Sequence, residues 1–520
     1  MKQTLSRIFS LLLSLPACLA LLTLAPGCST TAPNLPSGQE TVAGSSRPLR
    51  ESLVELHTTC VFGDAFMPWR LQRPSNNVGY AVAIEPHLLL APEQLIRNAA
   101  VTKIRRAGQG RFETVEVKLL DARAGLALLT LPESAVPLHP LPVAERIARH
   151  KNLMLAHFGS GDQVLQAPGT ITSIEMEYVN QASDMLLTFD IVSDLRSDTP
   201  GTPVLADGCL AGMVMRLKRN SDASLALAPD VIQGFLQAAA GDSYQSLPAA
   251  GFHFASLADP VRRRYLGVPD DEIGIQVINV IAGSAVDGLL QADDVLRAWN
   301  DYDIDSEGYI NHGLYGRMPL KCAIAESWGM LDRTTVTFLR EGEEKTIEVS
   351  LRPPDEAAMR VPENAVEAPN DYLVEGGLIF RELTQDYLRA RGDRWEFKVA
   401  TRLAWEALNQ ADSKGIPGER VVILSRVLPH PVNVGYEYLN DEIVTSVNGQ
   451  PVRNLRHLAA IIDRDGGLET IELVGWQDVP LSFDKASLRQ ANLVIQMTYR
   501  IPALRRIELS PTCAIEDTRP

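Results

Sequence analysis

The side chains best suited to covalent chemistry in this 520-residue chain are hydroxyls and imidazoles in its first half. Ser197 and Thr199 lie together in a loop that also contains proline and glycine. Histidine is the general base most often paired with a hydroxyl nucleophile, and four histidines occur in the same region: His57, His139, His150 and His157. Their spacing matches no known arrangement of nucleophile and base. A lone Ser or His in a β-rich domain is more often a surface or hydrogen-bonded core residue. Ser197 or Thr199 as a catalytic nucleophile is therefore kept only as an alternative.

Other kinds of chemistry have less support in the composition. Two of the six cysteines lie in the first 28 residues, and the other four show no CxxC pair and no metal-like spacing: Cys60, Cys209, Cys322 and Cys513. We therefore expect no metal and no cofactor, and we leave open whether Cys60 and Cys209 form a disulfide or remain buried thiols. The formal net charge of −15 repels phosphate backbones, which argues against a nucleic-acid partner.

The elements around Ser197 read as short strands. Between residues 52 and 240, short apolar segments alternate with Gly, Pro, Asn and Asp turns, which is the pattern of an all-β sandwich or barrel. The clearest segments are Val78–Ile84, His87–Ala91, Val115–Leu120, Leu126–Leu131 and Cys209–Met215.

The order of these segments resembles the trypsin-like domain of the Deg/HtrA serine proteases. Val78–Ile84 is similar to the family's G-x-G-F/Y-V-I strand, and three further segments follow where the family carries its catalytic residues: Leu90–Leu95, Gly125–Leu129 and Asp198–Val204. The resemblance places Glu93 at the position of the catalytic His, Gly125 at that of the Asp and Pro200 at that of the Ser.

These replacements remove the roles that acyl transfer requires. Glu93 is a carboxylate with an ordinary pKa near 4.3, a poor base for a serine hydroxyl at neutral pH. Gly125 has no side chain to orient a base. Pro200 has neither a hydroxyl nor the backbone N–H that would donate into the oxyanion hole. The sequence therefore predicts a degenerate catalytic triad.

Two segments further on resemble PDZ domains. Gly274–Asn300 follows the family pattern G-V-x-V…G-S-P-A…G-D-V-I-x-x-I-N-G. Just upstream, Tyr265, Leu266, Gly267 and Val268 resemble the loop whose amides bind a peptide carboxylate, and Ile275 and Val277 lie on the next strand, which would pair with the peptide. Arg262–Arg264 precede this loop. They could attract the terminal carboxylate of a peptide, or they could form a solvated helix face, and both alternatives stay open.

The second PDZ-like segment begins near residue 371. Gly376–Phe380 gives a loop and strand, and Leu439–Val452 matches the pattern L-x-D-x-I-x-x-V-N-G-x-P-V. Trp395–Asn409 is predicted as an inserted helix. This arrangement resembles the plant-type Deg subfamily, in which the second PDZ domain is associated with assembly as well as binding.

The N-terminus carries an export signal. Lys2 and Arg7 precede an apolar stretch from Ile8 to Leu24, which ends at Cys28. The residues before Cys28 resemble a bacterial lipobox, although Leu15–Cys18 fits that pattern more closely and an ordinary cleaved secretory peptide is a third possibility. We prefer Cys28, because cleavage at Cys18 would strand apolar Leu19–Leu24 on the mature protein.

Together these patterns predict a mainly β chain: a trypsin-like double β-barrel followed by two PDZ-like α+β domains. The expected divisions are a lipoprotein-type signal at 1–28, a flexible linker at 29–50, the degenerate protease domain at 51–240, a first PDZ domain at 251–353, a linker at 354–370 and a second, elaborated PDZ-like domain at 371–510. The functional hypothesis is a pseudoprotease that binds protein C-termini or unfolded polypeptides in the cell envelope, lipid-anchored and, by resemblance, trimeric. The alternative is an active endopeptidase of protein quality control with an unconventional nucleophile.

Overall fold

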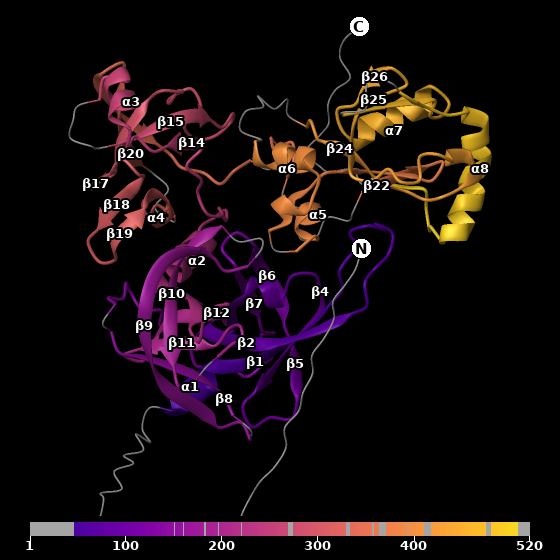
Figure 1. Ribbon diagram of the computed structural model, residues 1–520. Coiled ribbons are helices and arrows are strands. Elements are labelled where there is room, and N and C mark those ends of the chain that lie inside the picture. The colour runs from indigo at the N-terminus through magenta and orange to yellow at the C-terminus, as the bar shows by residue number, and fades with distance from the viewer. Residues whose placement is uncertain are drawn as a thin grey trace, which may run out of the picture. The chain divides into compact units, whose positions relative to one another are not determined.

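The computed structural model describes residues 46–149, 151–159, 161–180, 184–195, 197–219, 221–268, 274–328, 333–355, 358–362, 371–392, 394–409, 418–474 and 480–507 (Figure 1). The predicted signal segment with Cys28 lies outside these residues, as do His150 and Cys513. Part of the predicted flexible linker is ordered, because α1 (Ser46–Ser52) is a helix that contacts β1, β2 and β9. The reason is apolar burial: Leu49 is only 4% exposed and joins the main core.

The first domain begins with a seven-stranded antiparallel sheet in the order β5-β4-β1-β2-β3-β7-β6. Its strands are β1 (Leu53–Cys60), β2 (Ser75–Glu85), β3 (Leu88–Pro92), β4 (Ala99–Arg106), β5 (Phe112–Thr114), β6 (Glu116–Asp121) and β7 (Leu126–Thr130). All five residues of β3 are buried, because β3 lies between β2 and β7. A 3-10 turn, η1 (Glu93–Leu95), follows β3 directly.

A closed barrel completes this domain, in the order β10-β13-β12-β11-β8-β9 (Figure 1). Its strands are β8 (Leu153–Phe158), β9 (Val164–Tyr178), β10 (Met185–Ser193), β11 (Pro203–Ala206), β12 (Cys209–Leu217) and β13 (Ser224–Leu227). Helix α2 (Pro229–Ala240) packs on β10 and β12 through fully buried Ile232 and Phe235.

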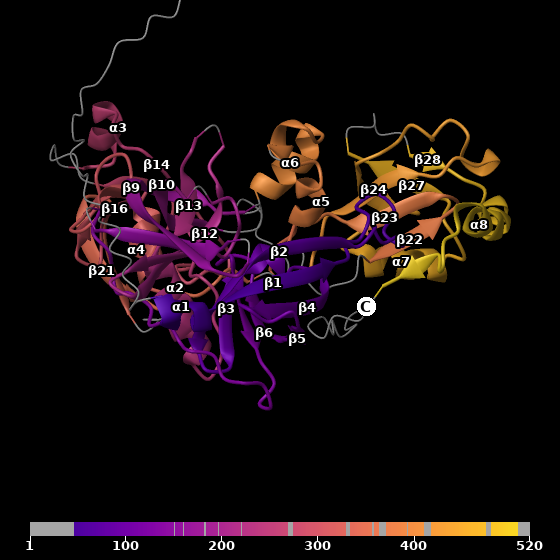
Figure 2. The same cartoon turned by 90° about the horizontal axis from the view of Figure 1, so that it is seen from below.

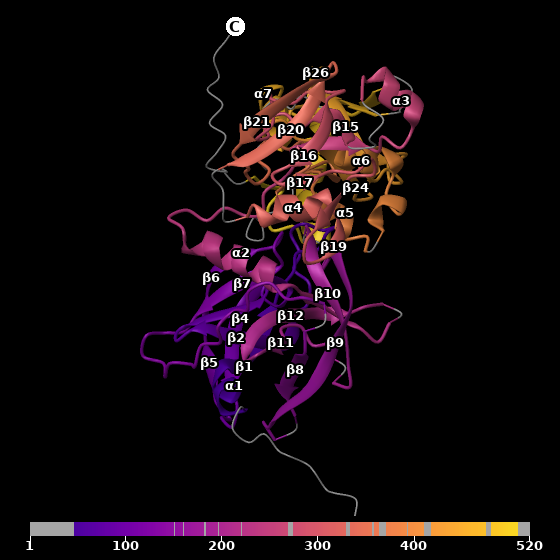
Figure 3. The same ribbon diagram turned by 90° about the vertical axis from the view of Figure 1, so that its left-hand side faces the viewer.

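The third sheet has the order β14-β15-β16-β20-β21, with β17 paired to β16. Its elements, including a separate β18–β19 hairpin, are β14 (Phe252–Ala255), α3 (Pro260–Tyr265), β15 (Ile275–Val280), β16 (Val295–Trp299), β17 (Tyr302–Asp303), β18 (Tyr309–His312), β19 (Gly316–Pro319), α4 (Leu320–Glu326), β20 (Thr334–Arg340) and β21 (Glu343–Val349). Helix α4 contacts α2 and β10, so this unit shares one apolar core with the barrel (Figure 3).

The fourth sheet has the order β28-β27-β25-β24-β23-β22-β29, with β26 paired to β25 (Figure 2). Its elements are β22 (Tyr372–Glu375), β23 (Leu378–Glu382), α5 (Gln385–Arg389), η2 (Trp395–Phe397), α6 (Thr401–Leu408), β24 (Val422–Val427), η4 (Pro431–Asn433), β25 (Glu442–Val447), β26 (Gln450–Pro451), α7 (Leu455–Arg464), β27 (Thr470–Leu473), β28 (Leu481–Ser482), α8 (Lys485–Tyr499) and β29 (Arg505–Arg506). In α7 the buried residues recur at helical spacing, and the Asn454 side chain caps its first turn by accepting from the His457 amide.

The predicted fold class is confirmed: the chain is mainly β, with a trypsin-like first part and PDZ-like α+β units after it. The predicted helix over Trp395–Asn409 differs in detail, because the chain forms the short turn η2 before α6 begins. The predicted linker at 354–370 also contains a fixed residue, since fully buried Val361 packs with Leu383 and Tyr387. Among the described residues, no helix has both the length and the apolar character needed to cross a bilayer.

Candidate functional site

Glu93 begins the η1 turn at the end of β3 and is fully buried. Its backbone carbonyl accepts hydrogen bonds from the amides of Ile96 and Arg97, which builds the turn. The Glu93 carboxylate is ion-paired with Arg97, with 2.5 Å between Nε and Oε1, and the Asn180 side-chain amide lies 3.4 Å from the other oxygen. The carboxylate is thus already occupied by neighbours from its own domain.

Burial raises the pKa of the Glu93 carboxyl above its ordinary value, and the Arg97 guanidinium opposes that rise. The negative charges of Asp121 and of Asp386, on α5, push the pKa in the same direction as burial. A raised pKa makes a carboxylate a stronger base. This one nevertheless has Arg97 and Asn180 as its side-chain partners, and neither offers a hydroxyl to deprotonate.

Gly125 lies directly against Glu93, because the Glu93 amide donates to the Gly125 carbonyl at 2.9 Å. Its φ of +67° belongs to the left-handed region that favours glycine. A Cβ at this position would lie 2.9 Å from the Val179 Cγ2 atom and 3.5 Å from the Met215 Cε atom. Apolar side chains therefore fill the space in which a catalytic Asp would begin.

Pro200 lies in the loop before β11, and its carbonyl accepts a 2.9 Å hydrogen bond from the Tyr80 amide on β2. The next residue, Gly201, has φ +88° and donates to the Val214 carbonyl at 2.8 Å. A Cβ on Gly201 would lie only 1.9 Å from the Tyr80 carbonyl oxygen. The loop is therefore pinned between β2 and β12.

The three triad positions come together around β2. Glu93 and Gly125 are hydrogen-bonded to each other. On β2, a Cβ at Gly79 would lie 2.4 Å from a methyl carbon of Leu95, in the same turn as Glu93, and 2.6 Å from the Pro200 carbonyl oxygen. The assignment of these positions as a degenerate triad remains a prediction, but the chain does place them as neighbours.

Of the alternative nucleophiles in this loop, the Ser197 hydroxyl is engaged in a local hydrogen bond. Buried Ser197 shares a 2.8 Å hydrogen bond with the Thr202 hydroxyl, and the Thr202 hydroxyl also lies 2.8 Å from the Thr199 carbonyl. Of the histidines in this domain, His57 contacts the Glu55 carboxylate at 3.1 Å, and burial lowers the pKa of His157. No hydrogen bond joins either loop hydroxyl to a histidine within the described part of the chain.

The predicted carboxylate loop of the first PDZ-like unit ends helix α3. The amides of Leu266, Gly267 and Val268 donate to carbonyls of Arg262, Arg264 and Arg263 at 3.1, 3.2 and 2.9 Å, and Gly267 has φ +69°. This is the usual way a helix satisfies its last carbonyls. These amides are therefore not free to form a nest, and Tyr265, which is 76% exposed, is the last residue of the helix. Arg262 is ion-paired with Asp293 at 2.9 Å.

Ile275 and Val277 lie on β15, which has β14 on one side and β16 on the other. Both side chains are fully buried, so they form core rather than a docking edge. Among the described residues, the outer strands of this sheet are β14 and β21, and the sequence reasoning missed β14, which lies next to β15. The available signal was the pair of aromatic residues Phe252 and Phe254 directly after Gly251.

Comparison with known proteins agrees with this architecture. The family model described as PDZ domain matches residues 361–506. Protease Do-like 2, a chloroplastic protein of Arabidopsis thaliana, is 26% identical over 472 residues, covering 88% of this chain and 75% of the relative. Putative protease Do-like 3, a mitochondrial protein of the same plant, is 23% identical over 468 residues, covering 88% of this chain and 80% of the relative. Over most of its length the chain is thus similar to Do-like proteases of the Deg/HtrA type. A solved structure, the HtrA-type protease AlgW with a decapeptide, aligns with 60% of this chain and 99% of its own at 16% identity and a TM-score of 0.44.

The second PDZ-like domain of this chain covers one of its own sheet edges. Strand β22 pairs antiparallel with β23 from Leu373 opposite Phe380 to Glu375 opposite Leu378, and α7 contacts both strands. A peptide that adds to a sheet needs an unpaired edge. At β23 that edge is already filled by the chain itself.

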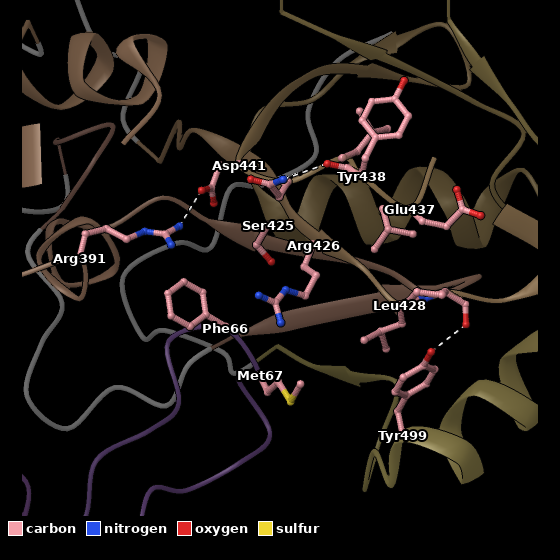
Figure 4. A pocket seen from close by; sticks show the side chains of 14 residues that line it. Phe66, Met67, Arg391, Ser425, Arg426, Leu428, Glu437, Tyr438, Asp441 and Tyr499 are labelled. Carbon is pink, nitrogen blue, oxygen red and sulfur yellow. Dashed lines mark hydrogen bonds and ion pairs between the residues drawn. The ribbon is translucent and has the colours of Figure 1, made fainter. Parts of the chain in front are cut away.

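A cavity of about 510 Å³ opens elsewhere in the same domain (Figure 4). One wall is the end of β24, from Ser425 to Pro429, and another is the segment Glu437–Asp441. Phe66 and Met67, from the loop between β1 and β2, complete it together with Arg391 and Tyr499. Sequence reasoning gave no signal for this cavity, because Phe66 and Met67 lie more than 320 residues before the rest of its lining.

Metal and disulfide chemistry have no visible basis at these sites. No group of three or more His, Cys, Asp or Glu side chains within the described ranges is arranged to hold a metal ion. Cys60, Cys209 and Cys322 are free thiols, so the open question of a Cys60–Cys209 disulfide is resolved in favour of separate cysteines.

Proposed function

We propose that this protein is a catalytically degenerate Deg/HtrA protein that binds peptide segments or unfolded polypeptides as an adaptor, chaperone or scaffold. The observation that carries the proposal is the neighbourhood of Glu93, Gly125 and Pro200, three adjoining positions that lack a nucleophile, a free base and an orienting side chain. Acyl transfer needs all three roles in mutual contact.

The residues at the predicted triad positions have structural roles. Glu93 neutralises Arg97 and caps the end of β3, and the Pro200 carbonyl holds β2 through the Tyr80 amide. Pro200 has no N–H to donate into an oxyanion hole. The loop has therefore become part of the packing between the sheet and the barrel.

Binding is the remaining function of the family's architecture. The PDZ fold recognises extended peptides by adding them as a strand to an exposed edge. In the first PDZ-like unit, β14 lies at one end of the sheet, and among the described residues it pairs with β15 alone. We therefore assign the first peptide-binding site to the β14 edge in place of the α3 terminus.

For location, we propose export with a lipid anchor on Cys28, at a bacterial-type cell envelope. The N-terminal signal pattern supports this placement, and several acyl chains on one cysteine give stable membrane association. The two relatives named above are organellar, chloroplastic and mitochondrial. A homotrimer through the first domain is the assembly that family resemblance favours.

The test is incubation of the purified full chain with a reduced, unfolded protein substrate, in the presence and absence of hydrophobic C-terminal peptides. We expect the substrate to stay intact and to co-purify with the chain. The matched variants are Ser197→Ala and Thr199→Ala. Fragments that appear with the wild type and vanish with either variant would overturn the proposal and establish the endopeptidase alternative.

A further inference from the structure

The cavity in the second PDZ-like domain lies where two neighbouring strands separate. Strands β24 and β25 pair only at Ile423 opposite Ile443 and Leu424 opposite Glu442. Strand β24 continues to Val427, still paired with β23 on its other side. Beyond Leu424, one edge of β24 therefore faces the cavity instead of a strand (Figure 4).

This stretch of edge presents backbone hydrogen-bonding groups. The Leu428 amide donates to the Gly377 carbonyl at 2.7 Å, on the β23 side. Because successive residues of a strand point their backbone groups to opposite sides, the N–H and C=O of Val427 point toward the cavity. An extended peptide can pair there, even though β22 occupies the edge of β23.

The mouth of the cavity carries a positive charge. The Arg391 guanidinium is committed to Asp441 at 2.6 Å, and the Glu437 carboxylate accepts from the Gly435 amide at 2.7 Å. Arg426 is exposed, and among the described residues no carboxylate lies within ion-pairing distance of it. Its guanidinium carbon lies 5.6 Å from the centre of the Phe66 ring (Figure 4).

The first domain supplies the third wall, and it is firmly held. The Asp64 carboxylate accepts from the Phe66 and Met67 amides at 2.8 and 3.0 Å, which fixes the turn. The Phe66 ring lies 4.5 Å from the Arg391 guanidinium carbon. Arg381 also donates to the Ala65 carbonyl. A preformed wall lowers the ordering cost of binding.

We propose that this cavity is a second peptide site, which takes an extended segment carrying a carboxylate. The segment pairs with the Val427 backbone, its carboxylate binds the Arg426 guanidinium, and its apolar side chains lie against Phe66 and Tyr438. The carboxylate is either the C-terminus of the peptide or an Asp or Glu side chain. The site rests on the proposed peptide-binding function and adds a chemical preference to it.

The probes are fluorescein-labelled hexapeptides of alternating Ala and Val, tested by fluorescence anisotropy with the full chain. One peptide ends in a free carboxyl, one in an amide, and one in an amide with a Glu side chain near its end. We expect the carboxylate-bearing peptides to bind more tightly than the neutral amide. Preference for the free acid identifies the C-terminus as the source, and preference for the Glu peptide identifies a side chain.

Arg426→Ala should weaken binding about tenfold, the loss expected for one charge-assisted hydrogen-bonded contact. Arg453→Ala is the matched control, because Arg453 is also exposed but does not line the cavity. Phe254→Asp, on β14, reports on the other site. If binding is unchanged by Arg426→Ala but reduced by Phe254→Asp, the cavity site is wrong while peptide binding stands. If no peptide binds to any form of the chain, both proposals fail.

Discussion

A single methyl group at Gly201 tests whether the loop that carries Pro200 is pinned to β2. In Gly201→Ala the new Cβ would lie 1.9, 2.7 and 2.9 Å from the carbonyl oxygen, carbonyl carbon and amide nitrogen of Tyr80. All three are backbone atoms of β2, which pairs with β1 at Tyr80 and with β3 from Val82 onward, so they cannot move away alone. Gly208→Ala is the control, because Gly208 has a similar φ of +79° and no atom near its Cβ.

The two variants share one cost and differ in the other. A left-handed conformation costs a non-glycine residue about 1–2 kcal/mol, and this cost applies to both. Relief of the clash at Gly201 also requires the loop to leave β2. That would break the Tyr80-to-Pro200 and Gly201-to-Val214 hydrogen bonds, each worth about 1 kcal/mol, and strain the packing by about 1–3 kcal/mol. We expect Gly201→Ala to destabilise the chain by about 3–5 kcal/mol more than Gly208→Ala.

Urea unfolding of both variants measures this gap, and hydrogen exchange of peptides covering β2 and β12 locates it. Faster exchange in both strands for Gly201→Ala alone is the expected pattern. Equal unfolding midpoints for the two variants would refute the reasoning, because they would show that the loop can leave β2 at no cost.

Three further predictions concern charge and anchoring. Because burial raises the pKa of Glu93, the folded chain holds the carboxyl proton to higher pH than the unfolded chain, in which Glu titrates near 4.3. Relative to Glu93→Gln, the wild type should therefore lose stability as pH rises from about 4.3 through the raised pKa of the folded state. Urea midpoints of the two proteins that stay parallel across pH 4–7 would contradict this. Asp294 is 1% exposed, and its carboxylate accepts hydrogen bonds from Arg340 at 2.7 and 2.8 Å. Asp294→Ala should lower the free energy of unfolding by about 3–5 kcal/mol, because Arg340 loses its carboxylate partner. The control Glu343→Ala, at an exposed position, should change it by less than about 0.5 kcal/mol. Cys28→Ser should abolish incorporation of an alkyne-labelled fatty acid in a bacterial host and Cys18→Ser should not, and the opposite result would move the lipidation site.

Sequence motifs were sufficient to locate the strands and loops that are recognised by a short local run of residues. The strand around Gly79, the η1 turn with Glu93 and the loop with Pro200 could be located because they follow one another in the order of the family's segments. The paired β2 and β3 then bring these segments together, as antiparallel neighbours must.

The elements proposed to bind peptide could not be found in the same way. Tyr265–Val268 has the residues of a carboxylate loop, yet a helix that ends in Leu-Gly needs those amides for its own carbonyls. The β14 edge was hidden because a four-residue strand gives almost no periodic signal. Phe66 reaches Arg391 only through tertiary folding, which no local pattern encodes.

The shared core between the barrel and the first PDZ-like unit has a consequence for how the chain acquires its structure. The Trp328 ring lies 6.2 Å from Phe235, and a Cβ at Gly234 would come within 2.9 Å of Trp328. During synthesis, α2 leaves the ribosome roughly 90 residues before Trp328, so the surface of α2 around Gly234 stays uncovered until Trp328 has been made. The barrel is therefore exposed to premature association for several seconds at ordinary elongation rates. Truncation after residue 240 would make that exposure permanent, and such a fragment is expected to aggregate.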